Sequence, residues 1–455
     1  MAADNKYSKS AALSMVVANM IGVGVFSAIG FQVIPIEKGG IPDNFAILLV
    51  WLIGGLISLC GAFVYAEIAT TLKQNGGEYT FLSKLYHPSL GFASGWISLI
   101  VGFSGAIAST GLAIGKYSGP ALGFDPSSHI YFFGLPLTNQ KIVGCVVICI
   151  ISIFHLRSVK TSGLLQTILT GIKILLLTIF CLAPFFIFYR DGISLFENFS
   201  PTTSSFSIIY SLPFASALVW VMYAYSGWNS AAYIAGSIKN PNKSIPFVLI
   251  IGVLLVTFIY VLLNASFLFF CTFEQMMYQE DVGNIVSIEL FGFRAGTVFA
   301  GFFSLALLST MSAMVIAGPK VSEQVGNDFS FFTKLSKKSK GGSPVFAILL
   351  QAFISIILVL FSSFQELIET LGITLAFFSL LTVFGVFILR KKYSVHERPV
   401  RTIGYPITPI IFISMILWMI VSFAIEDPIK IWYSFVAILP GFIIYFLIEK
   451  NEKKQ

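Results

Sequence analysis

Two short stretches of the sequence interrupt apolar segments with glycine, at matching places in the two halves of the chain. The first is Met20–Phe26, which contains Gly22 and Gly24, and the second is Tyr223–Asn229, which contains Gly227. Glycine lets the backbone leave helical geometry, and a helix that unwinds in a membrane exposes N–H and C=O groups without partners. Lipid tolerates such a break only around a polar cavity. The two stretches therefore predict one central binding site built largely from backbone.

The groups exposed at two such breaks suit opposite charges. The N-terminal end of a half-helix offers free N–H groups and partial positive charge to a carboxylate, whereas carbonyls at a C-terminal end suit an ammonium group. Two facing breaks can therefore hold the zwitterionic head of an α-amino acid without a charged side chain. The alternative is that the glycines only let helices pack closely. On the first interpretation the predicted binding residues are Ile21, Gly22, Val23, Gly24, Val25, Tyr223, Ala224, Tyr225, Ser226, Gly227 and Asn229.

Aromatic residues surround the second stretch, and an aromatic side chain beside a cavity can act as a lid. Tyr223 and Asn229 flank the break within about one helical turn. We therefore expect Tyr223 to be a gate and Asn229 to lie beside the site. Trp220 and Tyr233 are interpreted instead as interfacial or core-packing residues.

Lys173 is the sharpest single signal in the sequence. It lies about ten residues, or roughly 15 Å, into the apolar segment 163–188. A charge at that depth is costly and is by default functional, and we expect its partners to be carbonyls of a broken helix. The lysine can stand in for a bound cation, or it can lose its proton during transport. The alternative is a structural lysine that snorkels to the interface.

The elements that position these residues are apolar helices. Of the 455 residues, 56% are hydrophobic and only 11% are charged, less than half of the ~25% typical of soluble domains. The mean hydropathy is +0.87. This composition predicts an all-α polytopic membrane protein, surrounded by membrane lipids. The twelve predicted transmembrane helices are 11–31, 45–68, 90–118, 141–157, 162–189, 207–236, 246–271, 295–318, 344–361, 366–390, 406–424 and 430–449.

Basic residues indicate the orientation of these spans. With the N-terminus in the cytoplasm, Lys173 lies within a span and 21 of the 28 lysines and arginines fall on the cytoplasmic side. That excess predicts a multi-pass protein of the cell (inner) membrane with both termini cytoplasmic. The basic residues fall in separate short loops, which is not a nucleic-acid signal. The six on the outer side are Lys38, Lys116, Lys141, Arg190, Arg294 and Lys430.

A weak internal repeat organises the spans into a single transmembrane domain, 1–455. Spans one to five and six to ten each open with a glycine-broken helix. Because five is odd, the second set would be inverted relative to the first, as in inverted-repeat transporters. The predicted repeats are about 8–190 and 205–392, and the extra helices lie in 404–449.

Several motifs, in order, resemble the amino acid permeases of the amino acid–polyamine–organocation (APC) superfamily and its L-type transporter branch. The stretch Ile21-Gly-Val-Gly-Val-Phe26 resembles the first-helix signature of that family, and Tyr223-Ala-Tyr-Ser-Gly-Trp-Asn229 resembles its sixth helix. Further similar stretches are Tyr65-Ala-Glu-Ile68, Gly76-Gly-Glu-Tyr79, Leu156-Arg-Ser-Val-Lys-Thr-Ser-Gly163 and Gly236-Ser-Ile-Lys-Asn-Pro241.

The resemblance implies a LeuT-like fold of two inverted five-helix repeats plus two helices, with helices one and six broken, and amino acid uptake or exchange by alternating access. It implies that the Gly22–Val25 backbone meets the substrate carboxylate and that carbonyls of Tyr223–Ser226 meet the amine. Lys173 would brace helix one near helix eight, where sodium-coupled relatives of the fold bind an ion. Two positions depart from the pattern. Val23 replaces a hydroxyl residue, and Ser237 replaces a frequent glutamate whose inner-gate role is in doubt here.

The sequence favours a sodium-independent transporter of neutral amino acids. We see no acid near either break to balance a cationic side chain, and a sodium ion beside Lys173 would be repelled. Exchange and proton symport both remain open, as does the oligomeric state. The alternatives are a non-transporting membrane sensor or complex subunit, and a channel. No nucleophile–base pair or His/Cys/carboxylate cluster lies at membrane depth, so we expect no enzyme, metal or cofactor site.

Overall fold

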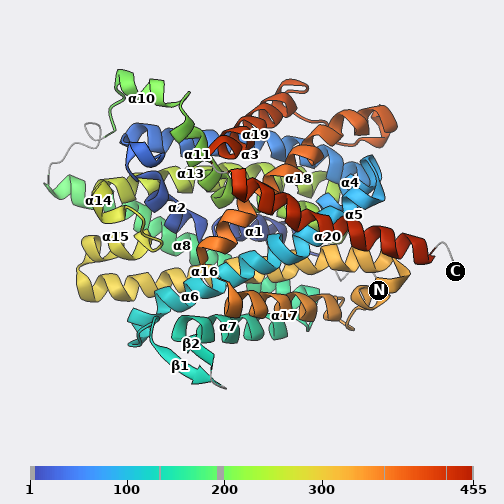
Figure 1. Cartoon of the computed structure of the whole chain (residues 1–455), viewed down its shortest axis with the longest axis horizontal. Coiled ribbons are helices and arrows are strands. Elements are labelled where there is room, and N and C mark those ends of the chain that lie inside the picture. The colour runs from blue at the N-terminus through green and yellow to red at the C-terminus, as the bar shows by residue number, and fades with distance from the viewer. Residues whose placement is uncertain (1–5, 133–134, 192–198, 363, 427, 453–455) are drawn as a thin grey trace.

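The computed structural model describes residues 6–132, 135–191, 199–362, 364–426 and 428–452. Most of the long helices run roughly along the longest axis of the molecule (Figure 1). The N- and C-termini lie toward one end of that axis, whereas the short helices α14 (Phe273–Met276) and α15 (Val282–Phe291) lie toward the other end.

The described residues of the first part of the chain, up to Asp191, form eight α-helices, a short 3-10 helix (Ile36–Lys38) and one hairpin. A π-helical segment, Ser98–Gly105, joins two of the helices into a continuous span. The hairpin is antiparallel and pairs Ile130 with Leu137. The helices are α1 (Lys9–Met20), α2 (Gly24–Gln32), α3 (Asn44–Leu72), α4 (Glu78–Leu85), α5 (Pro88–Ile97), α6 (Ala106–Leu122), α7 (Asn139–His155) and α8 (Val159–Asp191), and the strands are β1 (His129–Phe132) and β2 (Leu135–Thr138).

The second part of the chain is helical throughout its described elements. It contains a second short interruption, between the helices that end at Tyr225 and begin at Ser230. Besides α14 and α15, its helices are α10 (Thr203–Ile208), α11 (Leu212–Tyr225), α12 (Ser230–Tyr233), α13 (Pro241–Phe270), α16 (Phe293–Asp328), α17 (Val345–Phe361), α18 (Phe364–Lys392), α19 (Ile407–Glu426) and α20 (Pro428–Glu452).

The protein is a multi-pass membrane protein. Nine helical stretches in the described part are long and apolar enough to cross a bilayer, and α7, α11, α15 and α17 are shorter apolar helices. Twelve spans and an inverted repeat therefore remain predictions. Both predicted interruptions are present: α1 ends at Met20 before α2 begins at Gly24, and α11 ends at Tyr225.

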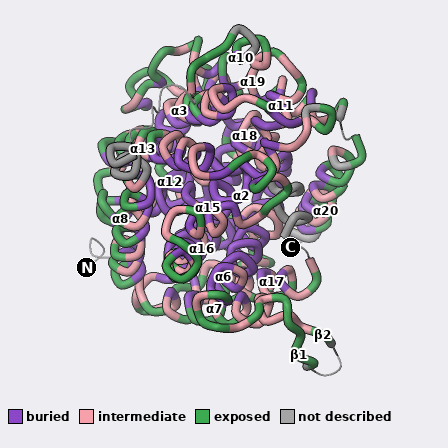
Figure 2. The backbone as a smooth tube through the Cα atoms, turned by 90° about the vertical axis from the view of Figure 1, so that its left-hand side faces the viewer, coloured by how far each residue is buried: buried purple, intermediate pink, exposed green. Residues whose placement is uncertain are grey.

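The outer helices present apolar faces to their surroundings. On α8 the exposed residues Leu164, Ile168, Ile172, Leu175 and Ile179 recur every three or four positions, so they form one continuous stripe. Figure 2 shows that burial is concentrated around α2, α6 and α16, whereas α7, α8 and α20 carry exposed faces. An apolar stripe of this length suits hydrocarbon rather than water.

The stretch of chain that follows α12 is tied to the N-terminal segment. The Tyr7 amide donates to the Ser237 carbonyl at 2.8 Å, and the Lys239 amide donates to the Tyr7 carbonyl at 3.0 Å. The Asn75 side chain donates to the Ser237 hydroxyl at 3.0 Å. Ser237 therefore joins the chain after α12 to the N-terminal segment and to the loop before α4.

A buried carboxylate joins the end of α3 to α18 and to the loop before α19. Glu67 is fully buried and accepts hydrogen bonds from the Arg390 guanidinium at 2.8 Å and the Arg398 guanidinium at 2.6 Å. The Thr402 amide and hydroxyl also donate to it, at 2.8 and 2.6 Å. The paired charges and satisfied lone pairs make the arrangement tolerable in the interior.

We expect Glu67→Gln to lower stability strongly, because it leaves two guanidinium groups without their countercharge. Breaking a buried pair costs about 3–5 kcal/mol. The matched control is Glu280→Gln, which removes an outer ion pair to Lys116 whose side chains are 36% and 32% exposed. A surface pair contributes about 0–1 kcal/mol. Thermal unfolding midpoints in detergent check this, and equal midpoints for both variants would contradict it.

Candidate functional site

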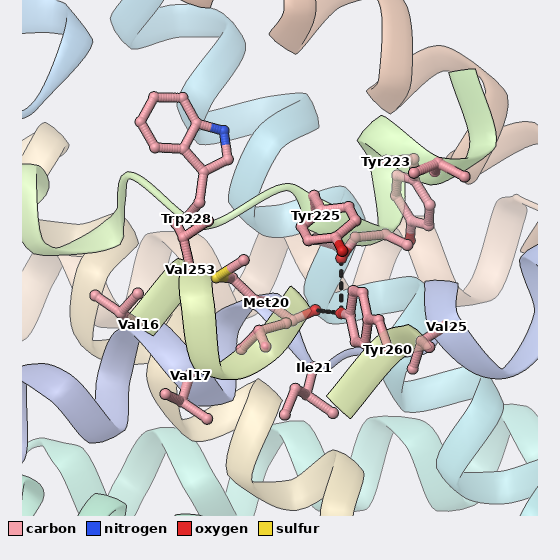
Figure 3. Packing of buried hydrophobic residues seen from close by; sticks show 14 of the residues in the cluster. Val16, Val17, Met20, Ile21, Val25, Tyr223, Tyr225, Trp228, Val253 and Tyr260 are labelled. Carbon is pink, nitrogen blue, oxygen red and sulfur yellow. Dashed lines mark hydrogen bonds between the residues drawn. The ribbon is translucent and has the colours of Figure 1, made fainter. Parts of the chain in front are cut away.

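Tyr260 of α13 links the two interrupted helices. Its hydroxyl group lies within hydrogen-bonding distance of the Met20 carbonyl, at the end of α1, and 2.9 Å from the Ala224 carbonyl, near the end of α11. Figure 3 shows the ring between the two breaks, with both interactions drawn. Carbonyls at a helix end lack intrahelical partners, and the hydroxyl of this tyrosine can donate to one from either break.

Lys173 of α8 contacts the first interruption and does not line the cavity described below. Its ammonium group donates to the Ala18 carbonyl at 3.1 Å, the Ile21 carbonyl at 2.6 Å and the Thr310 hydroxyl at 2.7 Å. The Thr310 hydroxyl also donates to the Ile21 carbonyl, at 2.8 Å. The side chain is fully buried, so it does not snorkel. Its partners are carbonyls of the broken helix, as the sequence predicts.

The beginning of α2 offers unpaired backbone donors. The amide of Gly22 donates to the Met20 carbonyl, and that of Phe26 to the Val23 carbonyl. Between them, the N–H groups of Val23, Gly24 and Val25 find no backbone acceptor in the described part of the chain. Buried N–H groups are rarely left without a partner. The start of α2 is therefore suited to bind an anion.

Two glycines let the broken helices approach each other. A Cβ atom on Gly24 would lie 2.9 Å from the Ala224 Cα atom and 3.0 Å from the Tyr223 ring. Gly227 has a φ of +90°, a conformation that L-residues rarely adopt, and a Cβ atom there would lie 3.0 Å from Asn19. The close packing and the helix breaks thus use the same glycines, so the two interpretations of these residues are compatible.

A cavity of about 80 Å³ lies between the two interruptions. One water needs only about 10–15 Å³ by the same measure, so a small organic molecule fits. Eight of the eleven predicted binding residues line the cavity, whereas Ile21, Val25 and Tyr225 do not. Tyr225 instead donates its hydroxyl to the Trp51 carbonyl at 3.0 Å. The eight lining residues are Gly22, Val23, Gly24, Tyr223, Ala224, Ser226, Gly227 and Asn229.

One expectation about this region is incomplete and another is wrong. Tyr233 packs in the core, as expected, and it also lines the cavity, because α12 is a single turn that follows the break. An acid does lie near a break: Glu78, the first residue of α4, lines the cavity and accepts from the Asn229 side chain at 3.1 Å. Burial raises the pKa of the Glu78 carboxyl, and hydrogen bonds from Tyr65, Ser379 and Asn229 oppose that rise.

Sequence reasoning also missed Asn19, Tyr260 and Thr310. Asn19 of α1 lines the cavity, is 5% exposed, and its side-chain oxygen has no partner in the described residues. Polar side chains inside apolar segments were the available signal, because lipid disfavours them. That signal does not say which of the many serines, threonines and tyrosines in these spans meet, since each contact joins distant parts of the chain.

Residues 8–448 match the amino acid permease family. The chain belongs to that family. The serine/threonine exchanger SteT of Bacillus subtilis (strain 168) is 27% identical to this permease over 445 residues, which cover 97% of this chain and 96% of the relative. The b(0,+)-type amino acid transporter 1 of Mus musculus is 25% identical, with 96% and 86% covered.

A third relative of this permease, the cystine/glutamate transporter of Homo sapiens, is 26% identical over 97% of this chain and 85% of its own. The family and these relatives are transporters or exchangers of amino acids, not enzymes. The names of these relatives indicate different amino acid substrates. Any narrower assignment of substrate to this permease must therefore be argued from the residues that line its cavity.

We expect Gly24→Ala to destabilise this permease, because the new methyl group meets the backbone of α11 and forces α2 away from it. Overpacking of this kind costs about 1–3 kcal/mol. The control is Gly171→Ala in α8, where a Cβ atom meets nothing within 4 Å. Alanine there favours the helix by about 0.5–1 kcal/mol. Unfolding midpoints that move together would refute the expected contrast.

Proposed function

We propose that this permease is a secondary active transporter that moves neutral amino acids across the cell membrane by alternating access, independently of sodium. The observation that carries the proposal is the meeting of two helix breaks at one buried cavity, with unpaired donors at the start of α2. The excess of basic residues in the predicted inner loops supports a topology with both termini in the cytoplasm.

The two breaks divide the amino acid head between them. The N–H groups of Val23 and Gly24, which line the cavity, receive the substrate carboxylate at the positive end of α2. The ammonium group meets carbonyls around the end of α11, which Ser226 and Gly227 terminate. The unpaired Asn19 oxygen supplies another acceptor on the cavity wall. Tyr223, whose ring packs beside Gly24, serves as the gate.

The residues that line the cavity favour a substrate with a neutral side chain. The reason differs from the one given by the sequence, which was that no acid lies near either break. Glu78 lies on the wall, so the absence of an acid no longer excludes cations. The rest of the side-chain region is largely apolar, and burying a charged group there without a partner is costly. The apolar lining residues include Phe103, Met222, Met314, Leu375 and Ile416.

Lys173 supports sodium independence. Its ammonium group is surrounded by two carbonyl oxygens and one hydroxyl oxygen, which are ligands that a sodium ion would otherwise use. A second cation among the same oxygens would be repelled. Exchange is favoured over proton symport because the bacterial relative named above is an exchanger.

Purified permease in liposomes is expected to accumulate radiolabelled neutral amino acid, and to do so faster when unlabelled amino acid is present inside. Replacing sodium with potassium on both sides should leave the rate unchanged. Competition by the twenty amino acids and putrescine, measured as inhibition of uptake, defines the substrate class. Uptake of arginine or putrescine without any neutral amino acid, or flux that needs a sodium gradient, would overturn the proposal.

Lys173→Ala is expected to lower uptake about 10–100-fold, because a buried hydrogen bond to a charged group contributes about 1.5–3 kcal/mol. Thr310→Val should lower uptake less, and Thr310→Ser, which keeps the hydroxyl, should retain it. The matched control is Lys141→Ala, since Lys141 also donates to a carbonyl, that of Leu360, but lies away from the cavity. Folded protein is verified by size exclusion. Wild-type flux in Lys173→Ala would assign the lysine a purely structural role.

A further inference from the structure

One carboxyl group lies on the cavity wall and belongs to neither helix break. Glu78 begins α4, a short helix outside the membrane-spanning segments, and only 1% of its surface is exposed. Of the described residues that line the cavity, it is the one that carries a formal charge. Lys173 is not part of that lining. The charge that a bound molecule meets directly is therefore negative.

Hydrogen-bond donors from several elements fix the Glu78 carboxylate in place. One oxygen, Oε1, accepts from the Tyr65 hydroxyl, from the Asn229 side chain at 3.1 Å and from the Ser379 hydroxyl at 3.0 Å. The Tyr233 side chain interacts with the same carboxyl group. Burial raises the pKa of the Glu78 carboxyl, and these donors oppose that rise because they stabilise the ionised form. They also hold the group still, so it cannot turn away from a bound molecule.

Glu78 has no ion pair in the part of the chain that the structure describes. Of the three cations in the last turn of the neighbouring α18, Arg390 binds Glu67, Lys392 donates to the carbonyls of Lys84 and Leu85, and Lys391 is exposed. The groups that hold Glu78 are neutral hydroxyls and an amide. Its negative charge is therefore stabilised without being cancelled by a contacting cation, and it acts on whatever occupies the cavity.

We propose that Glu78 determines specificity by excluding amino acids with an anionic side chain. The inference rests on the proposed transport function and narrows its substrate class. Every amino acid presents the same carboxylate to the start of α2, so substrates differ at the cavity only in their side chains. For an assumed separation of about 8 Å and an effective dielectric of about 20, the repulsion between two negative charges weakens binding about 30-fold. Neutral side chains avoid this repulsion.

Glutamate and glutamine provide the sharpest test, because they have nearly the same shape and differ in side-chain charge. Proteoliposomes take up a radiolabelled neutral amino acid that the permease transports, and each unlabelled competitor is titrated to half-inhibition. Wild-type protein is expected to need at least about tenfold more glutamate than glutamine. Aspartate and asparagine form a second pair and should show the same direction. In Glu78→Gln the gap should shrink to within about threefold.

Two controls separate charge from positioning. Glu78→Asp keeps the charge, and Ser379→Ala removes one of its donors, so both should preserve the gap even if total uptake falls. Glu78→Ala is the second neutral variant, should Glu78→Gln fail to fold. Equal inhibition by glutamate and glutamine in wild-type protein, or a gap that persists in the neutral variants, would overturn the inference. A wild-type protein that transports no amino acid would instead overturn the proposed function.

Discussion

The interrupted helices depend on partners for the carbonyls that they leave exposed. A bilayer supplies no water to satisfy such groups, and each one left bare costs several kcal/mol. Here Lys173 donates to the carbonyls of Ala18 and Ile21, and the Tyr260 hydroxyl shares its one proton between the carbonyls of Met20 and Ala224. These four contacts allow unwound backbone to exist in the centre of the bundle. The cavity, its shape and its free N–H donors all depend on this unwound backbone.

The same contacts connect the two breaks mechanically. A phenol has a single proton to donate, so the Tyr260 hydroxyl must share it between carbonyls on α1 and α11. A change in the position of one half-helix therefore alters the hydrogen bond made to the other. Lys173 adds a second connection, since its ammonium group joins α1 to α8 and α16. If α1 moves, Tyr260 and Lys173 must move with it, or its carbonyls must find other hydrogen-bond donors.

The sequence predicted what local chemistry determines and missed what tertiary contacts determine. Glycines in apolar segments predicted both interruptions, and a lone lysine in lipid had to find carbonyl oxygens, so the partners of Lys173 were predictable. Glu78 was not, because α4 lies outside the predicted spans and its contact with Asn229 joins residues 151 positions apart. The position of Tyr233 on the cavity wall was missed for a similar reason, since nothing local indicates that α12 ends after one turn beside the cavity.

The charges around the cavity are divided between its two breaks, and that division bears on what it can hold. The positive features, Lys173 and the start of α2, belong to the first break. The negative one, Glu78, is bonded to Asn229 beyond the second break. An anionic side chain would bring a second negative charge toward Glu78 in a medium of low dielectric, where repulsion is strong. In the proposed binding mode, a zwitterion with a neutral side chain avoids this cost, because its carboxylate lies at the first break and its ammonium group lies at the carbonyls of the second.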